Sequence, residues 1–196
     1  MIKLGLTGGY GSGKSTIAKA IEAMGFPVFY ADQRAKQLYK RKDVKAQIRG
    51  VLGDHVFDDH GHIDKKKLAS TVFYDAQKLT RVNAILHPKV AEDFEQWLEQ
   101  QSHKLVFHEA ALLFEAGFQA KFDYVVTVSA PEELCVERVV RRDGVSREQV
   151  MQRMKYQYSD QKKRELADFI IENDQRSMVL PQLLELIEEW EVFGNA

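Results

Sequence analysis

A glycine-rich stretch, GGYGSGKST at residues 8–16, constrains the fold of this chain more than any other feature. It fits the pattern G-x-x-x-x-G-K-[ST] in full, with an apolar run, IKLGLT, before it and a helical pattern from Lys14 after it. Small residues let backbone N–H groups curl around phosphate oxygens, and the start of the helix directs its positive end at them. A flexible Gly/Ser turn is the competing interpretation, but the position between a strand and a helix favours a phosphate loop.

The polar side chains of this loop predict that it binds a nucleoside triphosphate, ATP, together with Mg²⁺. A lysine at position 14 reaches the β and γ phosphates as a compact charge, and the hydroxyl of Ser15 is suited to Mg²⁺. The predicted nucleotide-binding residues are Gly9, Gly11, Ser12, Gly13, Lys14, Ser15 and Thr16, with Ser15 as the metal ligand.

Short apolar runs alternate with helical patterns along the rest of the chain and predict an α/β fold. The runs are IKLGLT, FPVFYAD, KLVFHE, YVVTVSA and ADFIIEN. This alternation is typical of a three-layer, doubly wound parallel sheet, and 196 residues suffice for one such domain with a small insertion. Ligands of these sheets bind beyond the carboxyl ends of the strands, where the glycine loop, Asp32 and Glu109 are expected to gather.

Several local signals predict where helices begin. HPKVAEDFEQWLEQQ is expected to be a helix with Pro88 in its first turn, and SREQ at residues 146–149 is a capping box. Ser129 is expected to cap the helix that starts at SAPEE. Residues 33–87 are rich in Lys, Asp and His, and we interpret them as a mainly helical, inserted substrate subdomain.

The composition argues against several classes of partner. Lys and Arg number 28 and Asp and Glu 29, so a net charge of −1 gives no general attraction to nucleic acids or acidic membranes. No run of about 18 apolar residues predicts a membrane span, and the first residues indicate a strand instead of a signal peptide. The one cysteine, Cys135, is expected in the core and suits a reducing cytosol, so we expect a cytoplasmic protein. A monomer is the expected state.

Asp32 is the candidate general base. At the end of the second strand, its carboxylate would accept a proton from an attacking hydroxyl and orient that hydroxyl in line with the phosphate. The alternative is that Asp32 only caps the helix that follows, and the residues alone do not choose between these two roles.

Three arginines, Arg138, Arg141 and Arg142, share one face of a predicted helix before the Gly-containing segment DGVSREQ. Arginines that close over the phosphates would stabilise the charge of a phosphoryl transition state. The alternative is a solvated basic face paired with Glu137 or Asp143. The histidines of DDHGHID fit no standard zinc spacing and indicate a polar turn.

The order and spacing of several motifs resemble the dephospho-coenzyme A kinase family over nearly all 196 residues. The resemblance rests on LGLTGGYGSGKST, YADQRAKQLY, GHIDKKKLASTVF, ILHPKV, ALLFEAGF, ERVVRRDGVSREQVMQRMKYQ and LADFIIEN. It implies transfer of the γ-phosphoryl group of ATP to the ribose 3′-hydroxyl of dephospho-coenzyme A. It also implies a nucleotide-binding core at about 1–32, 88–135 and 165–196, a coenzyme-binding insertion at about 33–87 and a lid at about 136–164.

The family's site residues carry over to matching positions. Lys14, Asp32, Arg138 and Arg142 are implied as catalytic, and Thr7, Asp32, His87, Leu112 and Glu115 as substrate contacts. The chain departs from the family pattern at Tyr30, Lys65, Ala111 and Cys135, where an acid, Arg, Pro and Gln are usual. None of these positions is in the phosphate loop, so they bear on substrate affinity more than on reaction class.

Two alternatives remain open at this level. Another small-molecule kinase of the same fold, acting on nucleosides, nucleotides or a metabolite, would carry the same phosphate loop. A nucleotide-dependent switch would carry it too, but no Asn in this chain is followed by Lys, so the guanine-reading motif N-K-x-D is missing.

Overall fold

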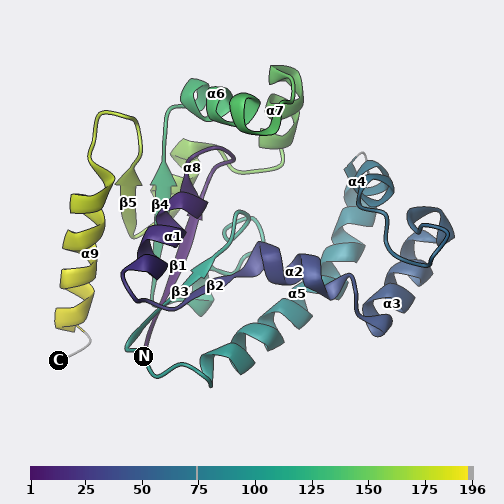
Figure 1. Cartoon of the computed structure of the whole chain (residues 1–196), viewed down its shortest axis with the longest axis horizontal. Coiled ribbons are helices and arrows are strands. Elements are labelled where there is room, and N and C mark those ends of the chain that lie inside the picture. Colours follow the sequence, from purple (N-terminus) through teal and green to yellow (C-terminus); the bar gives the residue numbers. More distant parts are fainter. Residues whose placement is uncertain (74, 194–196) are drawn as a thin grey trace. The chain divides into compact units, whose positions relative to one another are not determined.

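The structure, a computed structural model, describes residues 1–73 and 75–193. It forms two compact units (Figure 1), one made of Met1–Tyr30 with the chain from Gln101 onward, and the other of Ala31–Gln100. Among the described residues, no helix has both the length and the apolar character needed to cross a membrane.

The first unit is built on a five-stranded sheet in which every neighbouring pair is parallel. The strands follow the order β2-β3-β1-β4-β5, and their bounds are Ile2–Gly8 (β1), Val28–Tyr30 (β2), Leu105–Glu109 (β3), Tyr124–Ser129 (β4) and Phe169–Glu172 (β5). All five carboxyl ends therefore meet at one edge. The predicted doubly wound parallel sheet is confirmed.

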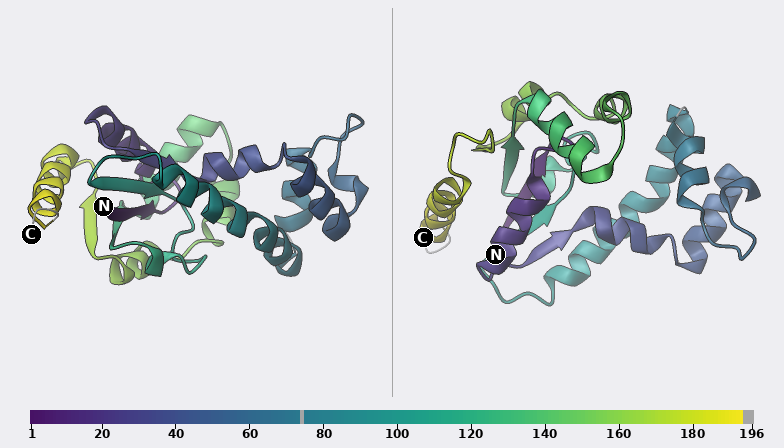
Figure 2. Two further views of the ribbon diagram at one scale, coloured as in Figure 1. Left: turned by 90° about the horizontal axis from the view of Figure 1, so that it is seen from below. Right: turned by 45° about the horizontal axis from the view of Figure 1, so that its top comes forward.

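Helices flank both faces of this sheet, with α1 and α8 on opposite sides in the left view of Figure 2. The helices of the first unit are Lys14–Ala23 (α1), Glu132–Asp143 (α6), Arg147–Met154 (α7), Asp160–Leu166 (α8) and Val179–Phe193 (α9), with a 3-10 turn at Gln119–Lys121 (η2). Leu4, Phe107 and Val128 from the strands pack with Trp190 of α9 in the main core, each at most 1% exposed.

The second unit is helical, as the sequence predicts for this region. Its helices are Ala31–Leu38 (α2), Lys42–Leu52 (α3), Lys65–Phe73 (α4) and Ala76–Leu98 (α5), with a 3-10 turn at Asp54–Val56 (η1). Between η1 and α4, the Asp58 carboxylate accepts hydrogen bonds from the backbone N–H groups of His60 and His62. This confirms the polar turn predicted for DDHGHID.

Three expected element boundaries are corrected. The helix around Pro88 starts much earlier, because the Asp75 carboxylate caps it by accepting a hydrogen bond from the Lys78 backbone N–H. A buried stripe then continues through the proline and consists of Val82, Leu86, Val90 and Phe94. An interior proline costs about 3 kcal/mol, which the burial of this stripe offsets. Residues 88–100 consequently lie in the second unit and not with the sheet.

The other two corrections concern Asp32 and Ser129. Strand β2 ends at Tyr30, and Asp32 lies in the first turn of α2, where a negative charge is favoured by the helix dipole. The helix α6 has Pro131 at its N-cap and no side-chain cap, whereas the Ser129 hydroxyl donates to Asp160 (2.7 Å) and accepts from Arg164 (2.8 Å). The capping box of Ser146 and Gln149 at α7 is confirmed.

Candidate functional site

The glycine loop between β1 and α1 adopts a backbone that only glycine tolerates at two positions. Gly11 and Gly13 have φ angles of 90° and 94°, in the left-handed region. A Cβ at Gly11 would collide with the carbonyl group of Cys135, and one at Gly13 with the side chain of Asn173. The loop is therefore shaped by its neighbours α6 and the end of β5 as well as by its own residues.

Arg138 and Asn173 hold this loop through the carbonyl oxygen of Ser12. The Asn173 side-chain amide donates to that oxygen at 2.7 Å, and the Arg138 guanidinium lies 3.4 Å from it. Arg138 also donates to the Asn173 carbonyl at 2.9 Å. The structure thus places Arg138 beside the phosphate loop, where its guanidinium faces the backbone carbonyl oxygens of Ser12 and Asn173.

Lys14 and Ser15 meet the carboxylate of Glu109 at the carboxyl edge of the sheet. The Lys14 ammonium donates to Glu109 Oε1, and Ser15 Oγ lies 3.2 Å from the same oxygen. Lys14 and Glu109 are both buried, at 7% and 3% exposed. The pairing of β3 with β1 opposes Glu109 to Leu6, which brings the carboxylate beside the loop.

Glu109 is the functional candidate whose partner the sequence did not show. Its position as the acid that ends the apolar run KLVFHE was the available signal, because it placed the side chain at the ligand-binding edge. Which loop residue it would contact depended on β3 and β1 being neighbours.

Tyr10 connects the glycine loop to helices α6 and α7. Its hydroxyl donates to Asp143 at 2.8 Å and accepts from Arg153 at 3.0 Å, and its backbone N–H donates to the Gln157 side chain at 2.8 Å. Its ring packs against the buried cluster of Val136, Val139 and Val150. This segment, 136–164, is the one that the sequence predicts to be a lid.

Arg142 forms a two-pronged ion pair with Asp143, at 2.7 and 2.9 Å, and its guanidinium lies 5.6 Å from the centre of the Tyr10 ring. This ion pair keeps the pKa of Asp143 well below its ordinary value, with the Tyr10 hydrogen bond as the next contribution. Arg142 is therefore close to the glycine loop through Tyr10, although its side chain, like that of Arg141, is exposed. The ion pair with Asp143 matches the alternative that the sequence left open.

The other predicted substrate residues of the first unit lie at the end of β1 and in the segment that follows β3. Thr7 is fully buried, and its hydroxyl lies 3.5 Å from the Ala111 carbonyl oxygen. Leu112 is 41% exposed. The Glu115 carboxylate pairs with Lys163 at 2.8 Å and accepts from the Tyr158 backbone at 2.7 Å.

Two of the departures from the family pattern lie next to this edge. The Tyr30 phenol donates to Glu22 at 3.0 Å, and burial, reinforced by Glu22, raises the pKa of Tyr30 to about 12. Cys135 is 3% exposed, and burial raises the pKa of its thiol to about 11. The expectation that Cys135 is a core residue is confirmed.

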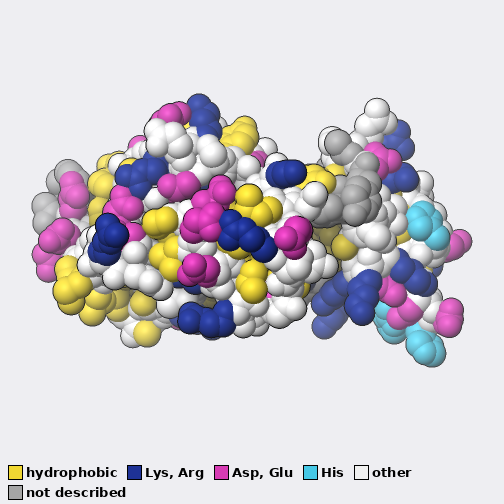
Figure 3. Space-filling view, turned by 90° about the horizontal axis from the view of Figure 1, so that it is seen from above, with side chains coloured by type: hydrophobic (Ala, Val, Ile, Leu, Met, Phe, Trp, Pro, Cys, Tyr) yellow, Lys and Arg dark blue, Asp and Glu magenta, His cyan; other side chains and the backbone are white. Residues whose placement is uncertain are grey.

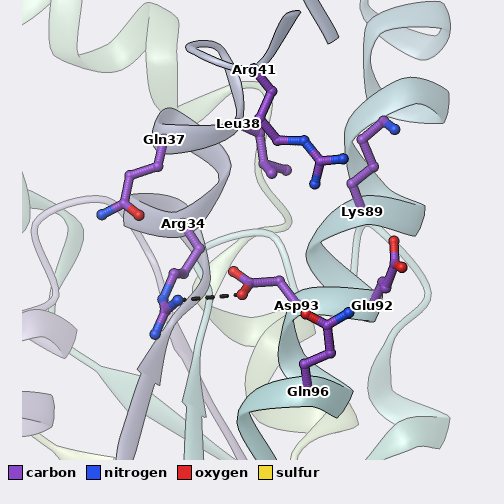
Figure 4. A pocket seen from close by; sticks show the side chains of 8 residues that line it. All are labelled: Arg34, Gln37, Leu38, Arg41, Lys89, Glu92, Asp93 and Gln96. Carbon is purple, nitrogen blue, oxygen red and sulfur yellow. Dashed lines mark hydrogen bonds and ion pairs between the residues drawn. The ribbon is translucent and has the colours of Figure 1, made fainter. Parts of the chain in front are cut away.

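In the second unit, α2 and α5 line a polar cavity of about 450 Å³. Figure 4 shows side chains from both helices converging on it, with Arg34 directed at Asp93 at 3.3 Å. Lys89 and Arg41 share a further carboxylate, Asp43, at 2.7 and 3.0 Å. The lining residues are Arg34, Gln37, Leu38, Arg41, Lys89, Glu92, Asp93 and Gln96.

Asp32 and His87 belong to this second unit, on α2 and α5. Burial lowers the pKa of His87 from its ordinary value. The exposed histidines gather with acidic side chains on the surface of this unit (Figure 3), but no cluster of His, Cys, Asp and Glu in the described part of the chain has the arrangement of a metal site.

Comparisons with known proteins give one consistent result. The model of a family described as dephospho-CoA kinase matches residues 2–178. The chain is 43% identical over 191 residues to a Bacteroides fragilis protein named dephospho-CoA kinase, covering 95% of this chain and 91% of that protein.

Two solved structures extend the likeness to the fold. A Thermus thermophilus protein has a TM-score of 0.85 at 32% identity, covering 97% of this chain and 96% of its own. The dephospho-CoA kinase from Campylobacter jejuni has a TM-score of 0.68 at 26% identity, covering 99% and 98%.

Proposed function

This chain belongs to the dephospho-CoA kinase family. We propose that it transfers a phosphoryl group from ATP to the ribose 3′-hydroxyl of dephospho-CoA, and that its own residues divide this work as follows. The observation that carries the proposal is the meeting of Lys14 and Ser15 at the Glu109 carboxylate beside the glycine loop. It supports a donor site at this edge of the sheet. The alternatives of another small-molecule kinase and of a nucleotide switch are not favoured.

The donor site consists of the loop from Gly9 to Gly13 and the first turn of α1. The N–H groups of the loop and of the N-terminal end of α1 hold the phosphates, and Lys14 neutralises the charge of the transferring phosphoryl group. Glu109 is the counter-charge of Lys14. A triphosphate therefore has to compete with this carboxylate for the lysine.

Mg²⁺ fits the oxygens at this place. Ser15 Oγ and Glu109 Oε1 lie 3.2 Å apart, and Mg²⁺ is usually held by one or two protein oxygens with waters and substrate phosphates completing its shell. When bound, the ion neutralises charge on the phosphates. Ser15 would hold it, and Glu109 would hold it directly or through a water.

Asp32 is the proposed general base for the acceptor hydroxyl. The resemblance supports this role, and the location in the first turn of α2, two residues after β2, is compatible with it. Asp32→Asn should then lower kcat by about 10²- to 10⁴-fold while ATP affinity changes little. If Asp32 has only a helix-stabilising role, the same variant will keep its kcat, and thermal melting will show at most a small loss.

The acceptor is proposed to bind the second unit at the cavity between α2 and α5. Arg41 and Lys89 are suited to a diphosphate group, which would replace Asp43 as their partner. Lys89→Ala should raise the KM for dephospho-CoA and leave the KM for ATP unchanged. Lys42→Ala is the matched control, because Lys42 is exposed on α3 and does not line the cavity. Equal effects of the two variants would refute this placement.

The segment 136–164 is proposed as the lid, with Arg138 and Arg142 as its arginines. Arg138 supports the loop through Ser12 and Asn173, and Arg142 lies near the Tyr10 ring with its guanidinium on Asp143. Phosphate oxygens would compete with Asp143 for the Arg142 fork. We also propose a monomer in the cytoplasm. The single, buried thiol of Cys135 supports the reducing compartment and does not bear on the oligomeric state.

The product of the reaction tests the function directly. The protein is incubated with ATP, Mg²⁺ and dephospho-CoA, and the product is identified by chromatography and mass. A product that co-elutes with authentic coenzyme A is expected. Phosphorylation of adenosine or a nucleoside monophosphate, without any product from dephospho-CoA, would instead identify another kinase of this fold.

A further inference from the structure

Lys163 is a charged side chain that has no assigned role and lies completely inside the protein. It is on α8, and its side chain is 0% exposed. Burial lowers the pKa of Lys163, and its contacts with Glu115 oppose that shift. An ammonium group in the interior is costly unless its hydrogen-bonding capacity is satisfied, so its partners indicate what the position is for.

Among the described residues, the partners of the Lys163 ammonium lie in one short segment, the residues that leave β3. The Lys163 ammonium donates to the Ala111 carbonyl oxygen at 3.1 Å and pairs with Glu115 Oε1 at 2.8 Å. It also lies 6.0 Å from the centre of the Phe114 ring. One side chain of α8 therefore holds segment 111–115 at both of its ends.

The same segment is connected to the donor site at its start. Glu109, two residues before Ala111, contacts Lys14 and Ser15. The hydroxyl of Thr7, which directly precedes the glycine loop, approaches the Ala111 carbonyl oxygen at 3.5 Å. Segment 111–115 therefore begins beside the donor site, where the acceptor hydroxyl has to be placed.

The side chains of this segment differ in direction. Leu112 is 41% exposed, whereas the Glu115 carboxylate is directed inward, with Oε1 occupied by Lys163 and the Tyr158 backbone. The other oxygen, Oε2, is buried and has no hydrogen-bond partner among the described residues. Glu115 is thus placed to anchor the segment, and Leu112 is the member that can meet a ligand.

We propose that Lys163 and Glu115 form a buried anchor that positions segment 111–115 for the acceptor, so that Glu115 is a positioning residue and Leu112 the contact. This inference rests on the proposed function, together with the substrate role that the family resemblance implies for Leu112 and Glu115 in this segment. An apolar pair of similar volume would often fold as well or better, so a purely stabilising purpose does not account for an ion pair here. The pair instead fixes one geometry for the Ala111 carbonyl group and the exposed side chain next to it.

The test compares Lys163→Met with Lys162→Met on the same helix. Lys162 is the matched control, because its side chain is 53% exposed and its ammonium pairs with Glu165 at 3.6 Å. In Lys163→Met, the KM for dephospho-CoA should rise by about 10- to 100-fold, the scale of a misplacement of about 1 Å. The dissociation constant of ATP, measured by titration without acceptor, should stay within about twofold. Lys162→Met should leave both constants unchanged.

Two additional variants keep the test decisive if Lys163→Met folds poorly. Glu115→Gln should raise the acceptor KM alone, and the double variant Lys163→Met/Glu115→Gln should be less impaired than Lys163→Met, because no buried carboxylate is left without its cation. An unchanged acceptor KM in the folded variants, or equal shifts in the acceptor KM and the ATP dissociation constant, would overturn the proposal and leave only a structural pair.

Leu112→Ala separates this inference from the proposed function. If Leu112→Ala raises the acceptor KM and the Lys163 variants do not, the anchor is refuted and the acceptor segment stands. If Leu112→Ala and the Lys163 variants all leave the acceptor KM unchanged, the assignment of this segment to the acceptor fails as well. Formation of coenzyme A by the parent protein is measured in the same assay and is independent of both outcomes.

Discussion

Acidification is expected to destabilise this protein through His108, a buried histidine of the sheet. His108 lies on β3, is 5% exposed, and stacks on Phe29 with ring centres 5.2 Å apart. Burial lowers the pKa of His108 from 6.5 to about 4. The folded state therefore holds this ring neutral at pH values where the unfolded chain protonates it.

The sign and size of the effect follow from this difference. The unfolded state binds more protons below pH 6.5, so the contribution of His108 to stability is complete above the unfolded pKa and is lost as the pH falls toward about 4. Between pH 8 and pH 5 the loss from this one group amounts to about 2 kcal/mol, and the full difference between the two pKa values to about 3 kcal/mol.

Urea unfolding at several pH values between 8 and 5 measures this loss. The parent is compared with His108→Phe, which keeps a ring in the stack but cannot be protonated, so the difference between the two curves removes the contribution of other groups. His60→Gln, at an exposed histidine, is the control and should follow the parent. If the free energies of unfolding of the parent and His108→Phe decline in parallel with acidification, His108 is not held neutral by burial.

Four further predictions concern the loop and the lid. Lys14→Ala should lose most of its turnover, with each tenfold loss equal to about 1.4 kcal/mol of transition-state stabilisation; near-normal steady-state activity in a variant that melts cooperatively would contradict this. Arg138→Lys and Arg142→Lys keep the charge but lose the planar fork, so kcat should fall with little change in melting temperature, and parental kcat in both would identify a solvated basic face. Tyr10→Phe removes the hydroxyl that contacts Asp143 and Arg153. It should raise the KM for ATP by about fivefold, which is the equivalent of one hydrogen bond of about 1 kcal/mol. A change confined to the acceptor KM would argue against a link between the loop and the lid. Ser146→Ala removes the cap of α7 and should cost about 1 kcal/mol in urea unfolding, whereas an unchanged midpoint would show that the capping box contributes nothing measurable.

The sequence alone predicted the features that depend on neighbouring residues. The glycine loop between a strand and a helix, the parallel α/β sheet and the capping box at Ser146 are encoded within short windows, because each is defined by local backbone conformation and apolar spacing. Local signals were insufficient where tertiary packing overrode them. Pro88 indicates a helix start, but the buried stripe from Val82 to Phe94 carries α5 through it.

Only the tertiary structure decided which charges meet. Glu109 contacts Lys14 because β3 is the neighbour of β1, and Asn173 supports Ser12 because the end of β5 lies beside the glycine loop. The pair of Lys163 and Glu115 joins residues 48 positions apart in the sequence, and neither residue has a local pattern that marks it as buried. Such contacts depend on strand order and chain crossovers, which a single sequence does not specify residue by residue, so the site's chemistry was readable from its motif and its internal support was not.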